Sequence, residues 1–153
     1  MQDPAECYSC AASASRPPAV PGYEHIAGDE YWRLAHAFGT GLPGWLVLLP
    51  RRHVTAVAEL TGAEAAGLGS WQVRASQALH AVTGCAKTYV AQFAEGEGFA
   101  HVHFHIVPRP ADLAAELRGP GIFGLVGVPP AQEVTDQRKL EIAHALQRHL
   151  TGG

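Results

Sequence analysis

Short apolar and alternating segments along the chain predict the strands of one sheet. Residues 45–49 are all apolar and are followed by Pro50, which is typical of a buried strand. Gly28 and Asp29 supply a turn signal between two earlier segments, which predicts a hairpin. A turn rich in Glu and Gly at 95–98 joins the last two segments. The candidate strands are residues 25–26, 32–38, 45–49, 87–94 and 101–107.

Apolar positions that recur every three or four residues predict two helices. Thr61 and Glu64 have the spacing of a capping box, in which each side chain satisfies a backbone N–H group at the start of a helix. Gly84 stands where a helix over residues 61–83 would end, and a second helix is predicted over 134–150. Together the elements predict an α+β fold, an antiparallel sheet of about five strands with the first helix on one face. The apolar stripe of that helix consists of Leu68, Trp71, Ala75, Leu79 and Val82.

Two further segments are rich in proline, glycine or small residues and are predicted to be irregular. Residues 11–22 have the composition of a link between the N-terminus and the body of the protein. Residues 110–130 are predicted to form a surface loop with one short helical turn at 112–117.

The composition restricts the class of protein. The 153 residues suffice for one domain, and 47% apolar with 16% charged residues is a globular balance. The formal net charge is -3, from 11 basic and 14 acidic residues, so a general nucleic-acid-binding surface is not expected. No apolar run is long enough to cross a membrane, and the N-terminus lacks the apolar region of a secretory signal. We therefore expect a cytoplasmic protein.

Three of the nine histidines form a pattern that points to function. His101, His103 and His105 alternate with apolar residues, so in a strand the three imidazoles share one face of the sheet. The opposite face is then apolar and can pack on the predicted helix. A merely solvated face is the alternative, but protonated imidazoles repel one another and suit that purpose poorly. The apolar face consists of Val102, Phe104 and Ile106.

Two kinds of chemistry suit this row of imidazoles. A neutral imidazole nitrogen is a nucleophile near pH 7 when a hydrogen bond to the other nitrogen fixes its tautomer. Neutral imidazole is also a zinc ligand, and Cys7 and Cys10 form a C-x-x-C pair at structural-zinc spacing. Two imidazoles would complete a tetrahedral shell with the two thiolates. Alternatively, Cys7 and Cys10 are ordinary N-terminal cysteines.

The histidine row, with Pro108 and Arg109 after it, resembles the signature of the histidine triad (HIT) superfamily of nucleotide hydrolases and transferases. The stretch 44–53, which ends in His53, is similar to the strand that precedes this signature in the family. The resemblance covers about residues 7–109 and implies a HIT-like fold. Because the chain carries a C-x-x-C, it is most similar to the zinc-binding members of the group.

The resemblance also implies how the chain is organised. The expected units are an N-terminal zinc-ligand segment and linker (1–22), the HIT domain (23–109), and a loop and C-terminal helix packed on the same domain (110–153). A homodimer is implied as well. In such a dimer, three apolar residues of the loop either cover the partner's active site or pack on their own domain. These residues are Ile122, Phe123 and Leu125.

Roles for individual residues follow from the same resemblance. His103 would be the nucleophile that attacks phosphorus and forms a phospho-histidine, with its far nitrogen held by a backbone carbonyl or a neighbouring side chain. His105 would stabilise charge at the same phosphate. The substrate would be a small phosphate ester, anhydride or phosphoramidate that contains a nucleotide. Cys85 has no partner in this scheme and is expected to be a buried thiol. A structural zinc ion would be held by Cys7, Cys10, His53 and His101.

The chain departs from the family's pattern at three positions. Trp45 stands where the family has an additional active-site histidine, so charge stabilisation must come from elsewhere. Ala37, next to His36, stands where an acidic or amide residue holds the ribose hydroxyls. Gly98 lies near the place of a Ser or Gln that assists the leaving group. A divergent substrate specificity is therefore expected.

Two other functions stay open on the sequence alone. The three departures would also suit a zinc-stabilised protein that binds a phosphorylated ligand without catalysis. The histidine row itself would suit a catalytic zinc site with an open water position, but Cys7, Cys10 and His53 would then have no role.

Overall fold

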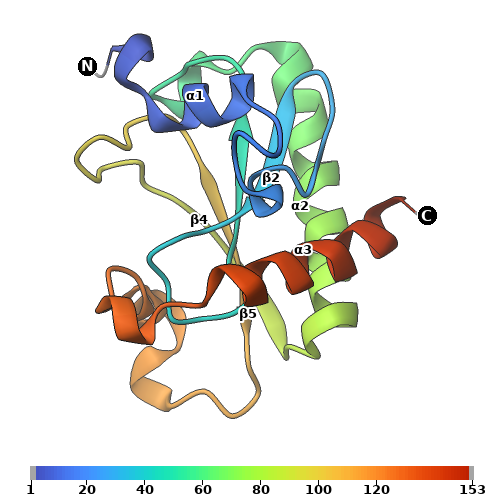
Figure 1. Ribbon diagram of the computed structural model, residues 1–153, viewed down its shortest axis with the longest axis vertical. Helices are drawn as coiled ribbons and strands as arrows, with labels where there is room; N and C mark the ends of the chain where they lie inside the picture. The colour runs from blue at the N-terminus through green and yellow to red at the C-terminus, as the bar shows by residue number, and fades with distance from the viewer. Residues whose placement is uncertain (1–2, 152–153) are drawn as a thin grey trace.

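A computed structural model of the chain describes residues 3–151 and shows an α+β fold (Figure 1). Within these residues one antiparallel sheet has five strands in the order β1-β2-β3-β5-β4. The predicted fold class is confirmed. The strands are β1 (Ala27–Gly28), β2 (Trp32–His36), β3 (Leu46–Pro50), β4 (Lys87–Gln92) and β5 (Phe104–Arg109).

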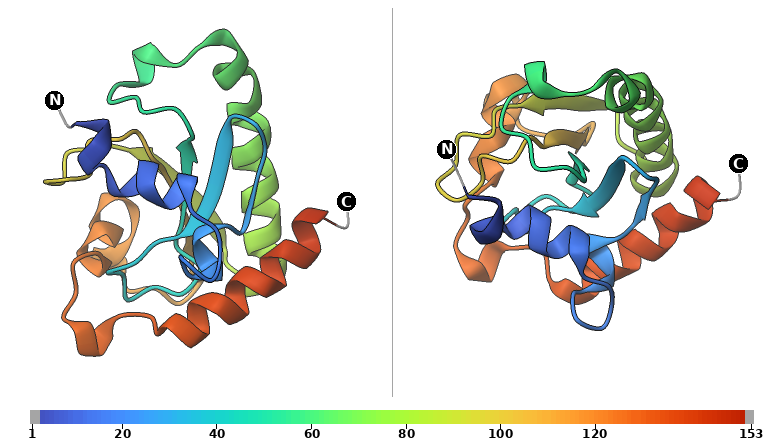
Figure 2. Two further views of the ribbon diagram at one scale, coloured as in Figure 1. Left: turned by 45° about the horizontal axis from the view of Figure 1, so that its top comes forward. Right: turned by 90° about the horizontal axis from the view of Figure 1, so that it is seen from above.

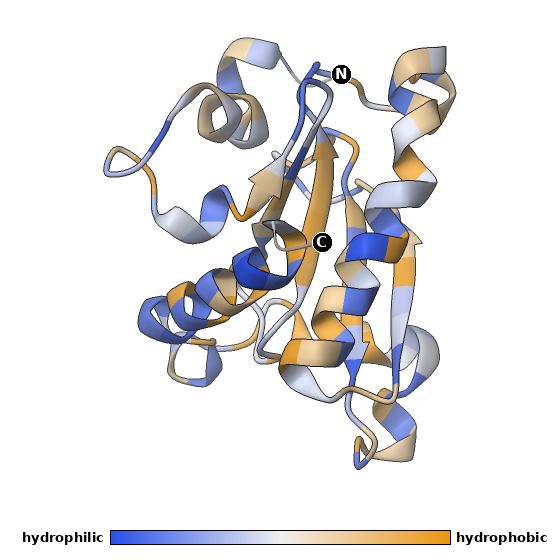
Figure 3. Cartoon of the chain, turned by 90° about the vertical axis from the view of Figure 1, so that its right-hand side faces the viewer, coloured by the Kyte–Doolittle hydropathy of each residue, from blue (hydrophilic) through white to orange (hydrophobic). Residues whose placement is uncertain are grey.

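The sheet divides the interior into two apolar clusters because successive side chains of a strand point to opposite faces. The main core lies between the sheet and the long helix α2 (Gly62–Thr83), and it includes Leu34, Leu48 and Ile106. Figure 3 shows the apolar strands at the centre and the helices with mixed polar and apolar surfaces around them. The other face of the sheet carries the candidate site.

The predicted capping box begins α2. Thr61 Oγ1 accepts a hydrogen bond from the N–H of Glu64 at 3.2 Å, and the Glu64 carboxylate accepts one from the N–H of Thr61 at 2.8 Å. Gly84 ends the helix at φ 67°, a left-handed conformation that glycine adopts without steric cost. No helix in residues 3–151 is both long and apolar enough to cross a membrane.

A short helix, α1 (Tyr8–Ala14), lies across the sheet from α2 (Figure 2). The prediction of an irregular link over residues 11–22 is therefore wrong for its first four residues, Ala11 to Ala14. The Cys7 sulfur caps the helix by accepting from the N–H of Cys10 at 3.4 Å. His25 donates from Nε2 to the carbonyl of Ala12 at 2.9 Å and holds the helix to the body. Tertiary contacts thus order a segment whose composition predicts a link.

β5 begins later than the histidine pattern predicts. The predicted strand includes the whole histidine row, whereas the ladder of β5 starts at Phe104. Its pairing on both sides starts at this residue, since Phe104 pairs with Leu48 of β3 and with Gln92 of β4, and β3 continues beyond Leu48 only in its ladder with β2. Val102 instead donates its N–H to the carbonyl of Val54 at 2.8 Å. The two faces still alternate, and the apolar members lie in the main core: Val102, Phe104 and Ile106.

The last third of the chain folds back onto the sheet. After a 3-10 helical turn at Ala115–Leu117, a second 3-10 stretch (Gly119–Leu125) buries Ile122 beside Trp45 in the second apolar cluster. This residue of the predicted surface loop thus packs on its own chain. The predicted C-terminal helix is confirmed as α3 (Asp136–Thr151), which packs against α2 and buries Leu146 in the main core.

Candidate functional site

Two histidines of the row line a pocket on the face of the sheet opposite α2. The pocket has a volume of about 430 Å³, and His103 and His105 form part of its wall. Their ring centroids are 4.9 Å apart, with the rings tilted by 75°. His101 lies in a separate cluster with His53, so the row divides between two neighbouring sites.

The hydrogen bond of His103 defines its tautomer. Nδ1 lies 2.8 Å from the carbonyl oxygen of His101, and a carbonyl oxygen only accepts, so Nδ1 carries the proton. In the neutral ring Nε2 then has a free lone pair. The resemblance led us to expect a backbone carbonyl or a side chain at this position, and the structure places the carbonyl of His101 there. This arrangement suits a nucleophile.

His105 has a different partner. Nε1 of Trp45 donates a hydrogen bond to Nδ1 of His105 at 3.0 Å, and the indole ring is fully buried. Burial lowers the pKa of His105 to about 4, and the charge of a protonated His103 lowers it in the same direction. His105 is therefore neutral at pH 7. Sequence reasoning identified Trp45 only as the loss of a histidine and missed this contact.

Four side chains that are distant in sequence meet in a compact cluster of Cys7, Cys10, His53 and His101. One sulfur or nitrogen atom from each lies within 4.8 Å of the others. The Sγ to Nδ1 distances are 3.5 Å from Cys7 to His101, 3.3 Å from Cys10 to His53 and 3.6 Å from Cys10 to His101. A tetrahedral zinc ion with Zn–S of about 2.3 Å and Zn–N of about 2.0 Å has S···N edges of roughly 3.5 Å. The four residues therefore fit this metal.

The protonation of the cluster agrees with a cation site. Nε2 of His101 donates to the carbonyl of Pro50 at 2.8 Å, which leaves the lone pair on Nδ1, the atom nearest the sulfurs. Burial lowers the pKa of His101 and keeps the ring neutral. Burial, and then the neighbouring Cys7, raises the pKa of the Cys10 thiol well above its ordinary value. A bound cation would reverse that effect on the thiol.

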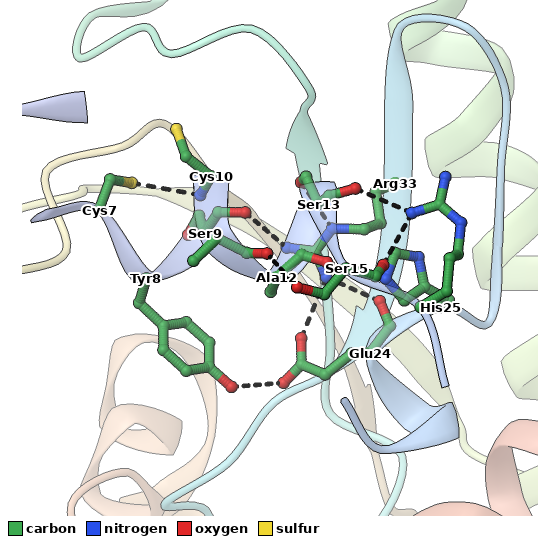
Figure 4. A network of polar contacts seen from close by, with 12 residues as sticks. Cys7, Tyr8, Ser9, Cys10, Ala12, Ser13, Ser15, Glu24, His25 and Arg33 are labelled. Carbon is green, nitrogen blue, oxygen red and sulfur yellow. Dashed lines mark hydrogen bonds and ion pairs between the residues drawn. The ribbon is translucent and has the colours of Figure 1, made fainter. Parts of the chain in front are cut away.

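A buried ion pair connects the N-terminal cysteines to the sheet (Figure 4). Arg33 on β2 pairs with Glu24 at 3.0 Å, and both side chains are almost fully buried. The same guanidinium donates to the carbonyl of Ser9 at 3.3 Å and to the hydroxyl of Ser13 at 2.9 Å, both in α1. Tyr8, which lies between the two cysteines, donates its hydroxyl to Glu24 at 2.8 Å. The helix that carries the thiols is thereby fixed to the sheet.

The wall of the pocket includes several aromatic side chains. Tyr8 packs on Phe38 with ring centroids 5.1 Å apart, and Phe38 packs on Phe99 at 5.7 Å. Among the lining residues, all within 3–151, Arg33 is the sole lysine or arginine, and Glu24 pairs with it. The pocket therefore offers a flat apolar group more contact than it offers a highly charged one.

His36 supports this wall and is not free to bind a ligand. Its Nδ1 donates to the carbonyl of Ala37 at 2.7 Å, and its Nε2 accepts from the N–H of Gly44 at 2.9 Å. Burial lowers the pKa of His36 to about 4. Ala37 lines the pocket without a polar side chain, and Gly98 is not among the lining residues. Cys85 is a buried thiol, as predicted.

Comparisons with known proteins find the same architecture. No family model matches the chain, and no curated protein matches it. Among solved structures, a Zn-bound histidine triad family protein from Mycobacterium smegmatis matches with a TM-score of 0.67 at 18% identity, over 99% of this chain and 100% of that chain. A hypothetical histidine triad nucleotide-binding protein from Sulfolobus tokodaii matches with a TM-score of 0.71 at 14% identity, over 95% and 93% of the two chains.

A third match is a histidine triad protein from Bradyrhizobium japonicum, with a TM-score of 0.67 at 24% identity, over 82% of this chain and 89% of that chain. These structures match the fold over 82% to 99% of the chain, although their sequences are only 14% to 24% identical to it. The chain therefore has the histidine triad fold.

Proposed function

We propose that the protein is a HIT-type hydrolase or nucleotidyl transferase that acts on a small phosphorylated molecule through His103. The observation that carries the proposal is the hydrogen bond from Nδ1 of His103 to the carbonyl of His101 at 2.8 Å, in the wall of a pocket. It fixes the tautomer that a nucleophile needs. The substrate is a nucleotide-containing phosphate ester, anhydride or phosphoramidate.

In the first step, Nε2 of His103 attacks phosphorus and forms a P–N bond. The bond from phosphorus to the leaving group breaks, and its electron pair departs with that group, which takes up a proton. The imidazole gains positive charge, and the carbonyl of His101 stabilises the Nδ1–H group that shares it. Positioning and charge stabilisation are the main sources of rate in such transfers.

In the second step, water attacks the phospho-histidine at phosphorus. The P–N bond breaks, its electron pair returns to Nε2 of His103, and the proton that water releases balances the proton taken by the leaving group. An alcohol or phosphate in place of water makes the same step a transfer. No step requires a metal ion at the reacting phosphorus.

We propose that the cluster of Cys7, Cys10, His53 and His101 holds zinc in a structural role. The S···N distances near 3.5 Å and the Nδ1 lone pair of His101 support this assignment. Zinc with four protein ligands supplies a rigid crosslink and has no open position for chemistry. The geometry favours this set over a catalytic zinc held by the histidine row, because Nδ1 of His101 lies 3.5 Å and 3.6 Å from the sulfurs of Cys7 and Cys10, in a cluster separate from His103 and His105.

A second candidate function is binding of a phosphorylated ligand without catalysis. Trp45, Ala37 and Gly98 favour it, because they stand where the family has side chains that assist catalysis or hold the ribose. In that case AMP would raise the melting temperature while His103 stays unmodified.

The test compares the wild-type protein with His103→Ala on AMP-phosphoramidate, adenylylated amines and dinucleoside polyphosphates. We expect turnover of at least one of them by the wild type, a mass increase on His103 after rapid acid-free quenching, and loss of both in the variant. His80→Ala, which changes an exposed histidine on α2, is the matched control and should keep full activity. No turnover of any substrate would contradict the proposed catalysis. If AMP still binds, the result would support ligand binding without catalysis.

We also propose that two copies of the chain form a homodimer along β4. This strand is at the edge of the sheet, and Val90 on it is 46% exposed. On the neighbouring helix α2, Val73 is 57% exposed. An uncovered apolar sheet edge is a pairing surface. Sedimentation should show a dimer that Val90→Lys weakens and that Val57→Lys, at an exposed position elsewhere, leaves intact.

A further inference from the structure

We propose that Trp45 is a positioning residue that holds His105 as its Nε2–H tautomer, so that His105 donates a hydrogen bond to the phosphoryl group under attack by His103. The inference rests on the proposed function and deepens it. It assigns a task to the residue that stands in place of the expected fourth histidine.

The chemistry of the contact fixes the direction of the hydrogen bond. The indole N–H of Trp45 is a donor and never an acceptor, so Nδ1 of His105, at 3.0 Å, must be the accepting nitrogen. A neutral imidazole carries its proton on the other nitrogen in that case. His105 is thereby held with its N–H group at Nε2.

The neighbouring His103 is held in the opposite tautomer. Its Nδ1 donates to the carbonyl of His101, which leaves the lone pair at Nε2. Two imidazoles 4.9 Å apart thus present different groups from the same ring position, a lone pair from His103 and an N–H from His105. One can attack phosphorus while the other stabilises the negative charge that builds up on its oxygens.

The packing around Trp45 keeps this hydrogen bond in place. The indole packs edge-on against Phe123 with ring centroids 5.3 Å apart, and Phe123 also packs edge-on against His105 at 5.0 Å. Phe123 comes from the 3-10 stretch Gly119–Leu125, whose Ile122 is buried in the same cluster as Trp45. The C-terminal third of the chain therefore packs against both Trp45 and His105 and holds them in contact.

The surroundings also keep His105 neutral, as the inference requires. Burial holds its pKa at about 4, and of its ring neighbours Trp45, Phe123 and His103 only His103 is an ionisable side chain. The strand neighbours Val47 and Ala91, which pair with His105 on either side, carry no charge. A neutral donor spares the site the cost of a buried cation beside the nucleophile.

Nitrogen NMR on protein labelled with 15N in histidine and tryptophan tests the tautomer without any substrate. In the wild type we expect His105 with an unprotonated Nδ1, a protonated Nε2, and a scalar coupling across the hydrogen bond between Trp45 Nε1 and His105 Nδ1. A protonated Nδ1 at His105, or the absence of this coupling, would overturn the inference even if Trp45→Phe fails to fold.

The variant Trp45→Phe tests the consequence, because it removes the N–H group and keeps an apolar ring. We expect a mixture of the two His105 tautomers, a loss of kcat of roughly tenfold or more, and a much smaller change in KM. Trp71→Phe is the matched control, since the Trp71 indole donates a hydrogen bond of 2.8 Å to the Asp29 carboxylate. Neither residue lines the pocket. This control should leave the His105 signals and kcat unchanged.

Binding of orthovanadate, which imitates phosphorus with five ligands, separates this inference from the proposed catalysis. We expect Trp45→Phe to weaken vanadate binding by roughly tenfold. Vanadate binding that depends on Trp45 in a protein without turnover would overturn catalysis and keep the positioning role. Unchanged kcat and unchanged vanadate affinity in Trp45→Phe would overturn the positioning role and leave catalysis by His103 standing.

Discussion

The backbone carbonyl of His101 accepts a hydrogen bond from Nδ1 of His103 at 2.8 Å. The side chain of His101 belongs to the Cys2His2 cluster, while its carbonyl orients the ring of the proposed nucleophile. Two tasks therefore meet in one residue. A ligand that fixes the side chain of His101 also limits the motion of the carbonyl that holds His103.

The first prediction concerns the metal. Cys10→Ser should remove zinc from the purified protein, because it deletes one of the four ligands. At free zinc of about 1,000 times the dissociation constant, binding contributes about 4 kcal/mol to folding, and the variant should lose that amount. Metal content and the free energy of unfolding measure both effects. Cys85→Ser, at a buried thiol outside the cluster, should keep its zinc; equal metal loss from both variants would contradict the assignment.

The second prediction concerns stability against acid. His36 has a folded pKa of about 4 because it is buried, and an unfolded pKa of about 6.5. Between these values the unfolded chain binds more protons, so stability falls as the pH drops from about 6.5 toward 4. His36 alone accounts for about 2 kcal/mol of the loss between pH 7 and pH 5.

His36→Gln should lose less unfolding free energy than the wild type over that interval, although it is less stable at pH 7. Urea denaturation at pH 5, 6 and 7 measures the slope, and any contribution from acid release of metal is common to both proteins. Identical slopes would show that the pKa of His36 is the same in the folded and unfolded states, and would contradict the prediction.

The third prediction concerns the buried ion pair of Arg33 and Glu24. Arg33→Met leaves the Glu24 carboxylate buried without its cation, which costs about 3 to 5 kcal/mol of unfolding free energy. Chemical denaturation measures the loss. Arg138→Met, which breaks an exposed pair with Glu141, is the control and should cost about 1 kcal/mol or less. A loss at Arg33 no larger than at Arg138 would mean that Glu24 is solvated in the variant.

The fourth prediction concerns the start of α2. Thr61→Ala removes the oxygen that accepts from the N–H of Glu64 and should cost about 1 kcal/mol of unfolding free energy. Thr61→Ser keeps a hydroxyl at the same position and should cost much less. Thermal and urea unfolding measure the free energy of unfolding of both variants. Equal losses in Thr61→Ala and Thr61→Ser would contradict the role of the hydroxyl as the cap.

Local patterns in the sequence predicted those elements whose cause is local. The capping box depends on residues three apart, and Gly84 ends the same helix, so α2 is found where the pattern places it. The alternation of the histidine row predicts which side chains share a face, because the pleat of a strand sets it. The composition of segment 11–14 predicts a link, whereas the segment is helical because contacts with distant residues such as His25 hold it.

The partners of the site residues needed the tertiary structure. Periodicity places His103 and His105 side by side, yet it does not reveal that Trp45, sixty residues earlier than His105, donates to its ring. The ion pair that anchors α1, from Glu24 to Arg33, likewise leaves no periodic signal. The resemblance to a known family supplied His53 and His101 as the proposed metal ligands, and spacing alone did not.

By itself, then, the sequence determined the two long helices, the row of imidazoles and the strands apart from the position of β1 and the start of β5, because hydrophobic periodicity and capping act over a few neighbouring residues. Only the tertiary structure decided the proton positions on these imidazoles. Each is set by one partner atom from another part of the chain, the carbonyl of His101 for His103 and the indole of Trp45 for His105. The chemistry proposed for this protein follows from those two contacts.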